Sequence, residues 1–297
     1  MTGPVATTLG DLVRVVQRRL EAAAVEDAGR EARRLVVAAG GVAPEALITR
    51  PQEAVGAALA NRIEEALGRR LVGEPIGRIV GYRDFFGRAF KLNAATLEPR
   101  ADSEVVIEAV LEVAGRQWGL DAPLRIVDVG TGSGCLLVTL LAELPAATGV
   151  GIDIAPAAVE AARANAVGHG VSERARFVVA DVLDGVEGAF DILVSNPPYI
   201  RRDEIGELSD EVRLFDPHLA LDGGPTGLDL YDRIARRMMG VVPDGWMFVE
   251  IGAGMRDAVE GVFDRQLGAT ADWLVWRDLN GHERCVARQS RLPKQHE

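Results

Sequence analysis

Two stretches of the sequence place glycines and polar groups directly after runs of apolar residues, where they could take part in chemistry. The first, VDVGTGSGC at residues 127–135, ends in a turn with a glycine at every second position. The second is Asn196-Pro197-Pro198-Tyr199, which follows the apolar run FDILVS. Glycines let a ligand lie against the backbone, and prolines hold neighbouring acceptor groups still. We therefore expect a ligand-binding loop and a rigid acceptor site, each at the end of a strand.

The glycine loop has the spacing G-x-G-x-G, not the G-x-G-x-x-G that seats a dinucleotide pyrophosphate at a helix N-terminus. It would lie at the carboxyl end of the first strand of a sheet, where sheets of this kind bind cofactors. Alone, such a loop can also be a plain tight turn between a strand and a helix. The residues of the loop that we expect to bind a cofactor are Gly130, Thr131, Gly132 and Gly134.

Two acidic residues after later strand-like runs indicate a nucleoside. Asp153 stands about 20 residues beyond the loop, where a carboxylate can accept hydrogen bonds from both ribose hydroxyls. Asp181 and Val182 follow the third run, where they would meet an adenine ring. No phosphate-loop lysine and no arginine pair stands near these residues in the sequence, which favours an adenosine without phosphates. We expect S-adenosylmethionine as the cofactor and S-adenosylhomocysteine as the product.

The Asn-Pro-Pro-Tyr turn indicates the group that would accept a methyl. Because proline fixes φ and has no N–H, the side-chain oxygen of Asn196 and the main-chain oxygen of Pro197 form a rigid acceptor pair. This pair fits a planar NH2 group, either a carboxamide or the exocyclic amine of adenine. By accepting hydrogen bonds from both N–H groups, the pair positions the substrate nitrogen and raises its electron density, so no strong base is needed. We expect Asn196, Pro197 and Tyr199 to be catalytic, with Pro198 completing the substrate site and the Tyr199 ring packing on the substrate.

The elements that must position these groups divide the chain into three parts. Residues 1–75 show apolar residues at helical spacing, which predicts a small all-α domain; its arginines lie either on a plain solvated surface or on a docking surface for a macromolecular substrate. Residues 76–96 alternate glycines with β-branched and aromatic residues, which predicts a linking β-hairpin. Residues 97–297 alternate strands with helices, which predicts an α/β domain with a parallel sheet. Asn280-Gly281 predicts a final antiparallel hairpin.

The net charge of −11 is unevenly spread over the 297 residues. Residues 1–80 hold 11 arginines against 10 acidic residues, a balance of +1, so the remainder carries −12. An acidic domain repels phosphate backbones, so we expect no nucleic-acid substrate.

The remaining bulk features concern metals, membranes and location. The two cysteines, Cys135 and Cys285, are too few for a disulfide framework, and no Cys/His cluster has zinc-ligand spacing. We expect no metal site. The N-terminus lacks the basic start and apolar stretch of a signal peptide, and the longest apolar segment is about half a membrane span. We expect a cytoplasmic monomer without membrane contact.

Taken together, these motifs closely resemble one family over almost the whole chain: the protein-(glutamine-N5) methyltransferases of peptide chain release factors, the HemK/PrmC family. The matching stretches are GEPIGRIVGYRDFFGRAFKLN, TLEPRADSE, DVGTGSGC, GIDIAPAAVEAARANA, SNPPYI, DPHLALDGGPTGLDLYDRI and VEIGAGM. The resemblance implies a Rossmann-like, seven-stranded S-adenosylmethionine-dependent methyltransferase domain behind a small helical domain. It also implies methylation of the glutamine in the Gly-Gly-Gln motif of class 1 release factors, a step that bears on translation termination.

One segment departs from the family pattern. Where relatives usually have PRPDTE, this chain has Pro99-Arg100-Ala101-Asp102-Ser103-Glu104. The resemblance places this segment near the methionine end of the cofactor, which adds Arg100 and Ser103 to the cofactor-binding residues. The alternative reading of the segment is structural, because Asp102 and Ser103 are also plausible N-caps for the helix that follows.

Two other enzymes would share these motifs. A glutamine methyltransferase of a ribosomal protein would differ only in its N-terminal domain and surface. An adenine-N6 methyltransferase of DNA or RNA would add a basic recognition region and flip its base, and the acidic charge balance disfavours it.

Overall fold

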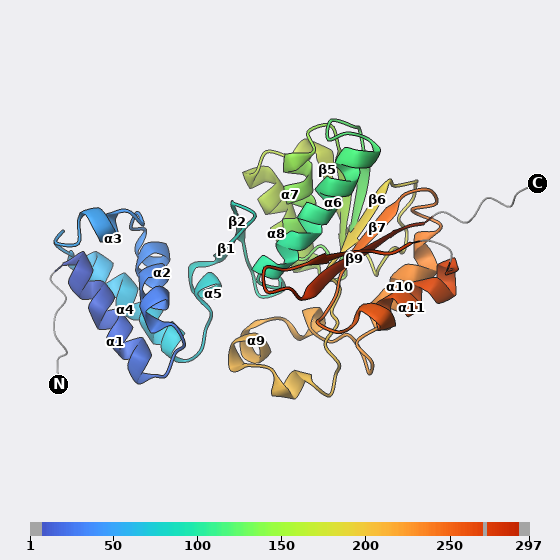
Figure 1. Ribbon diagram of the computed structural model, residues 1–297. Helices are drawn as coiled ribbons and strands as arrows, with labels where there is room; N and C mark the ends of the chain where they lie inside the picture. The colour runs from blue at the N-terminus through green and yellow to red at the C-terminus, as the bar shows by residue number, and fades with distance from the viewer. Residues whose placement is uncertain (1–7, 270–271, 291–297) are drawn as a thin grey trace, which may run out of the picture. The chain divides into compact units, whose positions relative to one another are not determined.

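The computed structural model describes residues 8–269 and 272–290, and the chain divides into two compact units. The first unit ends at Gly81 and the second begins at Tyr82 (Figure 1). Residues 1–7 of the expected helical domain and 291–297 of the expected methyltransferase domain lie outside the described residues.

The first unit is built from helices that share one apolar core. They are α1 (Leu9–Ala22), α2 (Ala28–Gly40), α3 (Ala46–Thr49), α4 (Ala57–Leu71) and α5 (Ile76–Val80). Leu12, Val16 and Leu20 recur every fourth residue of α1, so they lie on one face and pack into the core. Thr8 caps α1 by accepting a hydrogen bond from the Asp11 amide at 3.2 Å.

Residues 76–80, which we expected to belong to the linking hairpin, instead form α5. Pro75 precedes this helix and Gly81 ends it with a φ of 79°, while Ile76 is buried in the core of the first unit. The hairpin itself is shorter, and it consists of β1 (Tyr82–Phe85) and β2 (Arg88–Lys91) at the start of the second unit.

Among the described residues, the second unit has a seven-stranded sheet in the order β5-β4-β3-β6-β7-β9-β8. The strands are β3 (Arg125–Val129), β4 (Thr148–Asp153), β5 (Ala175–Val179), β6 (Ile192–Ser195), β7 (Trp246–Glu250), β8 (Leu274–Arg277) and β9 (Glu283–Gln289). Strands β3 to β7 pair in parallel, whereas β9 is antiparallel to both β7 and β8. The predicted α/β fold and its final hairpin are thus confirmed.

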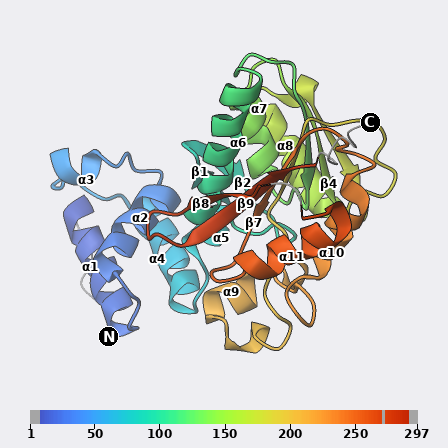
Figure 2. The same cartoon turned by 45° about the vertical axis from the view of Figure 1, so that its right-hand side comes forward.

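Helices cover both faces of this sheet (Figure 2). One face carries α6 (Glu104–Gln117), α7 (Cys135–Glu143) and α8 (Pro156–Gly168), and the other carries α10 (Asp229–Met238) and α11 (Arg256–Leu267). Successive strand residues point to opposite faces, so Ile126 packs with the first group of helices and Val127 with the second. A strand buried on both faces is apolar at most of its successive positions, which explains the nearly continuous apolar runs.

The order of the strands creates a switch point between β3 and β6. From β3 the chain proceeds outward through β4 and β5 on one side, and later through β6 and β7 on the other. The carboxyl ends of these parallel strands meet at one edge, and ligands of such sheets bind in the crevice there. Within residues 8–269 and 272–290, the helices are too short or too polar to cross a membrane.

Candidate active site

A cavity of about 340 Å³ lies at the switch point, over the glycine loop between β3 and α7. It brings together most of the residues predicted from the sequence: Arg100, Ser103, Gly130, Thr131, Gly132, Asp153, Asp181, Val182, Asn196 and Pro198. Gly134, Pro197 and Tyr199 do not line it. The predicted cofactor-binding and acceptor residues therefore line the same cavity, although they come from five separate parts of the chain.

The glycine loop is held against β4 by backbone hydrogen bonds. The amides of Gly130 and Thr131 donate to the Ile152 carbonyl at 2.9 and 2.8 Å. Gly130 and Gly132 have φ values of 73° and 55°, a conformation that favours glycine. No heavy atom lies within 4 Å of a Cβ built on Gly130, so the backbone there is open to a ligand.

Asp153 fastens the same loop through its side chain. Oδ2 accepts a hydrogen bond from the Gly132 amide and Oδ1 accepts one from the Ala155 amide, both at 2.9 Å. Burial raises the pKa of Asp153, while these amide donors act in the opposite direction. Each carboxylate oxygen has lone pairs left for further donors, such as hydroxyl groups.

Gly134, expected to bind the cofactor, lies outside the cavity. A Cβ built on Gly134 would lie 3.1 Å from the Cβ of Ala162 in α8. With its φ of 80°, Gly134 permits the turn into α7 and the close approach of α7 to α8. Its role in this structure is therefore in packing.

Three arginines also line the cavity, Arg100, Arg202 and Arg233, and all three come from segments far from the glycine loop in the sequence. Each is paired with an aspartate: Arg100 with Asp216 at 2.6 Å, Arg202 with Asp222 at 2.9 Å, and Arg233 with Asp181 at 2.5 Å. Asp181, which was expected to meet the adenine ring, is thus also ion-paired with Arg233 of α10. Because each guanidinium faces a carboxylate, the wall offers no unpaired arginine cluster for phosphate.

A second cavity of about 370 Å³ adjoins the first. Pro197 and Tyr199 line this second cavity, together with Glu250 and Arg284. Leu97, Arg100, Asn196, Pro198 and Ala220 line both cavities. Asn196 is thus at the junction of two adjacent cavities, one beside the glycine loop and one beside Tyr199.

The side chains around Asn196 are hydrogen-bonded to one another. Asn196 Nδ2 donates to Ser103 Oγ at 3.1 Å. Tyr199 Oη donates to Glu250 Oε1 at 3.4 Å. Ser103 stands at the N-cap position of α6, but its side chain makes no capping hydrogen bond there.

Glu250 is the residue of this site that the sequence argument left without a role. It ends β7, just as Asp153 ends β4, but an acid at the end of a strand is too common a signal to have given it a role from the sequence alone. The ring of Tyr199 was expected to pack on the substrate, and in the structure its hydroxyl also donates a hydrogen bond to this carboxylate. Burial raises the pKa of Glu250 to about 7 and also raises the pKa of Tyr199.

The segment before α10 supports the acceptor turn. The Ile200 amide donates to the Leu221 carbonyl at 3.2 Å, and the Gly223 amide donates to the Ile200 carbonyl at 2.8 Å. A Cβ on Gly223 would lie 2.8 Å from the Pro198 carbonyl oxygen, closer than real Cβ atoms approach. The glycine therefore allows this segment to pack directly on the turn.

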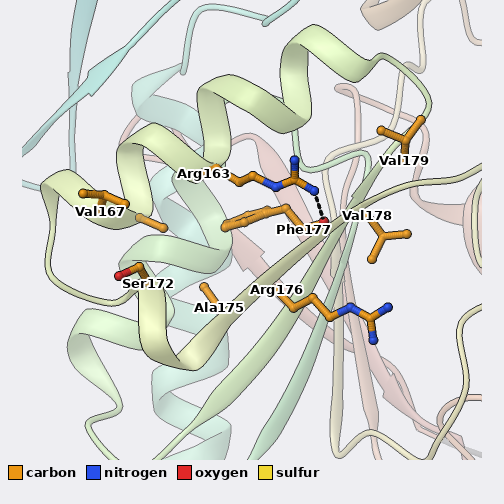
Figure 3. Close-up of a pocket in the computed structure, with 9 residues that line it drawn as sticks. Arg163, Val167, Ser172, Ala175, Arg176, Phe177, Val178 and Val179 are labelled. Carbon is orange, nitrogen blue, oxygen red and sulfur yellow. Dashed lines mark hydrogen bonds between the residues drawn. The ribbon is translucent and has the colours of Figure 1, made fainter.

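A wider hollow of about 630 Å³ lies elsewhere, between α8 and the edge strand β5. Figure 3 shows Arg163 reaching from α8 to the carbonyl of Phe177, to which it donates at 2.7 Å. Apolar side chains such as Val167 and Val179 make up most of the remaining lining. None of the predicted site residues lines this hollow, so its larger volume does not make it the active site.

Comparisons with known proteins agree with this architecture. The family model described as methyltransferase small domain matches residues 118–211, and the model described as PrmC N-terminal domain matches residues 11–81. The release factor glutamine methyltransferase of Bradyrhizobium diazoefficiens is 44% identical, over 94% of this chain and 94% of its own. That of Rhodospirillum rubrum is 41% identical, over 96% of this chain and 86% of its own.

A solved structure shares the fold at low sequence identity. The hMettl16 catalytic domain, in complex with a 3′UTR hairpin, has a TM-score of 0.55 at 14% identity. The similarity covers 77% of this chain and 83% of that chain.

Proposed function

The chain belongs to the family of release factor glutamine methyltransferases, and we propose that it methylates a glutamine side-chain amide in a peptide chain release factor, using S-adenosylmethionine. We take the target to be the glutamine of the Gly-Gly-Gln motif in class 1 release factors. The observation that carries this proposal is the position of Asn196, at the junction of a cavity suited to the cofactor and a cavity suited to the substrate.

The first cavity fits S-adenosylmethionine in shape and chemistry. Gly130 and Gly132 leave the backbone open, and the Asp153 carboxylate can accept hydrogen bonds from ribose hydroxyls. Ile154, Val182 and Leu230 would give the adenine ring an apolar wall. When bound, the cofactor supplies an electrophilic methyl group on a positively charged sulfur.

The acceptor turn would prepare the glutamine amide for the transfer. Since Asn196 Nδ2 is engaged by Ser103, its Oδ1 is the atom left to accept a hydrogen bond from the substrate NH2. The Pro197 carbonyl would accept the second N–H. These two acceptors would hold the nitrogen in line with the methyl group on sulfur, and they would stabilise the positive charge that develops on the nitrogen. The nitrogen then loses a proton, so the product is a neutral methylated amide.

We further propose that the helical first unit docks the release factor. A single glutamine side chain in a small cavity provides too little contact area for the specific recognition of a protein. We take the enzyme to be a monomer. Because release factors act on ribosomes, we place the enzyme in the cytoplasm. The negative charge of the second unit disfavours a nucleic-acid substrate.

The test is methyl transfer from labelled S-adenosylmethionine to three candidate acceptors: a purified release factor, ribosomal protein and duplex DNA. We expect label on the release factor alone, and none on a release factor whose Gly-Gly-Gln glutamine is replaced by alanine. Label on ribosomal protein or DNA, with an unmodified release factor, would overturn the proposal.

A further inference from the structure

A tight turn between β7 and α11 packs directly against the ring of Tyr199. This β7–α11 turn runs from Gly252 to Met255, and the Met255 amide closes it by donating to the Gly252 carbonyl at 3.1 Å. Gly254, its third residue, has a φ of 77°, a conformation that favours glycine at this position of a turn. Because the first and fourth residues of such a turn lie close together, the side chain of Met255 comes back toward Gly252.

Gly252 is required by its neighbours and not by its own backbone. Its φ lies outside the left-handed region that favours glycine. A Cβ built on Gly252 would lie 2.8 Å from Met255 Sδ and 3.1 Å from Cδ2 of the Tyr199 ring. Real Cβ atoms essentially never come within 3.0 Å of another heavy atom. The sulfur and the edge of the ring therefore take up the space that a side chain would need.

The rest of Tyr199 is enclosed as well. A Cβ on Gly227, in the segment before α10, would collide with the Tyr199 carbonyl oxygen and would lie 3.4 Å from Met255 Cε. At the far end of the ring, Tyr199 Oη donates to Glu250 Oε1 at 3.4 Å. The Glu250 carbonyl in turn accepts from Tyr231 Oη of α10 at 2.6 Å, which anchors the end of β7. Tyr199 is thus held at its backbone, at its ring edge and at its hydroxyl.

We propose that Gly252 and Met255 are positioning residues, which fix the angle at which the Tyr199 ring meets the substrate. Tyr199 lines the second cavity, whereas Gly252 and Met255 line neither cavity, so they can act on the substrate only through Tyr199. This inference rests on the proposed function, in which the ring packs on the target glutamine. It gives a role to the stretch VEIGAGM, whose last four residues form the β7–α11 turn.

Close packing explains why one methyl group at this turn should affect the reaction. A protein interior has little empty space, so a methyl at Gly252 must displace either Met255 Sδ or the Tyr199 ring. The flexible methionine absorbs part of the displacement, and the ring must still move by a few tenths of an ångström. Contact between the ring and a flat amide weakens over such distances, and the reacting nitrogen loses its alignment with the methyl group.

The primary test is Gly252→Ala. We expect kcat for release-factor methylation to fall about 3- to 30-fold, because a misplacement of about 1 Å can cost roughly 100-fold and this one is smaller. Cofactor affinity should stay within about twofold, since the turn does not line the first cavity. Gly261→Ala in α11 is the matched control. Outside the helix backbone, the nearest heavy atom to its Cβ would be Arg265 Nη1 at 3.7 Å, so kcat should not change.

A double-mutant cycle with Tyr199→Ala separates positioning from general damage. Because Gly252 acts through the ring, adding Gly252→Ala to Tyr199→Ala should reduce kcat by less than about twofold. Additive losses, or a Gly252→Ala enzyme with wild-type kcat, would overturn the inference. If Gly252→Ala does not fold, Met255→Ala takes its place in the cycle and the same two outcomes refute the inference. Met255→Leu keeps the bulk of the side chain and should retain kcat within about threefold.

Two further readouts keep this inference distinct from the proposed function. If label reaches ribosomal protein or DNA instead of the release factor, the proposed function fails, and the same variants are then compared on the acceptor that takes the label. A crystal structure of Gly252→Ala gives a readout apart from activity. The Tyr199 ring should be displaced relative to a wild-type crystal, and an unmoved ring would refute the inference.

Discussion

The Gly132 amide donates to Asp153 Oδ2 at 2.9 Å, which ties the glycine loop after β3 to the end of the neighbouring strand β4. Asp153 Oδ1 holds the start of the next loop through the Ala155 amide. One carboxylate therefore sets the positions of two backbone segments that line the same cavity. The loop is shaped before any ligand arrives, and this preorganisation reduces the entropy lost on binding.

Replacing Asp153 by asparagine should weaken cofactor binding. Asparagine has one acceptor oxygen where aspartate has two, so either the Gly132 or the Ala155 amide loses its partner. A lost hydrogen bond to a charged group is worth about 1.5–3 kcal/mol, which corresponds to a roughly 10- to 100-fold weaker Kd. Isothermal titration with S-adenosylmethionine measures this. Exposed Asp121→Asn is the control and should bind normally; equal affinity of both variants would contradict the role of Asp153.

Replacing Asn196 by alanine should impair methyl transfer but leave cofactor binding intact. The variant loses the acceptor at the junction of the cavities but keeps the glycine loop and Asp153. We expect methyl transfer to drop by about 100-fold or more, with cofactor affinity within about threefold of wild type. Titration and labelled transfer, performed on the same preparation, check both values. Loss of cofactor binding in Asn196→Ala, with normal behaviour of exposed Asn280→Ala, would mean that the turn serves the cofactor.

Adding one methyl group at Gly223, next to the acceptor turn, should displace the turn. A Cβ at Gly223 would meet the Pro198 carbonyl oxygen at 2.8 Å, and backbone cannot move aside cheaply. We expect Gly223→Ala to lose about 1–3 kcal/mol of stability and to slow methyl transfer at least about tenfold. Gly206→Ala is the matched control, because no heavy atom lies within 4 Å of its Cβ. An unaltered transfer rate in Gly223→Ala would show that the turn is not supported from this side.

Asp128 should make the second unit less stable as pH rises. Burial raises its pKa from 3.8 to about 7, although Thr131 donates to it at 2.6 Å. Between these values the folded state holds a proton that the unfolded state has lost, so the free energy of unfolding falls from pH 4 to pH 7 and then levels off. Glu250 acts in the same direction.

We expect Asp128→Asn to reduce the loss of stability between pH 5 and pH 8 by on the order of 2–4 kcal/mol, following about 1.4 kcal/mol per pKa unit. Urea unfolding at the two pH values measures this. The four tryptophans, Trp118, Trp246, Trp273 and Trp276, all belong to the second unit, so their fluorescence follows that unit alone. An identical pH dependence in wild type and variant would show that Asp128 does not titrate in this range.

Features encoded by neighbouring residues were predictable from the sequence. The runs that became β3, β4 and β6 are mostly apolar, apart from buried polar residues such as Asp128 and Ser195, and the Asn280-Gly281 turn predicts the β8–β9 hairpin. Asp153 was predictable because its distance from the glycine loop is set by one strand and one helix. These features depend on local pattern, which a single sequence displays.

Features created by contact between distant segments were not predictable in the same way. The pairing of Asp181 with Arg233 joins residues from the end of β5 and from α10. The hydrogen bond from Tyr199 to Glu250 depends on the pairing of β6 with β7, and the one from Asn196 to Ser103 joins the end of β6 to the start of α6. The packing role of Gly134 depends on Ala162 in α8, and no spacing rule within the loop distinguishes it from Gly130 or Gly132.

The hydrogen bond from Arg163 to Phe177 has a consequence for the behaviour of the protein in concentrated solution. Strand β5 is the last strand on its side of the sheet, and an unprotected last strand invites a strand from another molecule to pair with it. Such a strand would have to displace the Arg163 guanidinium from the Phe177 carbonyl and approach the exposed charge of Arg176. The two arginines thus protect this edge of the sheet from aggregation.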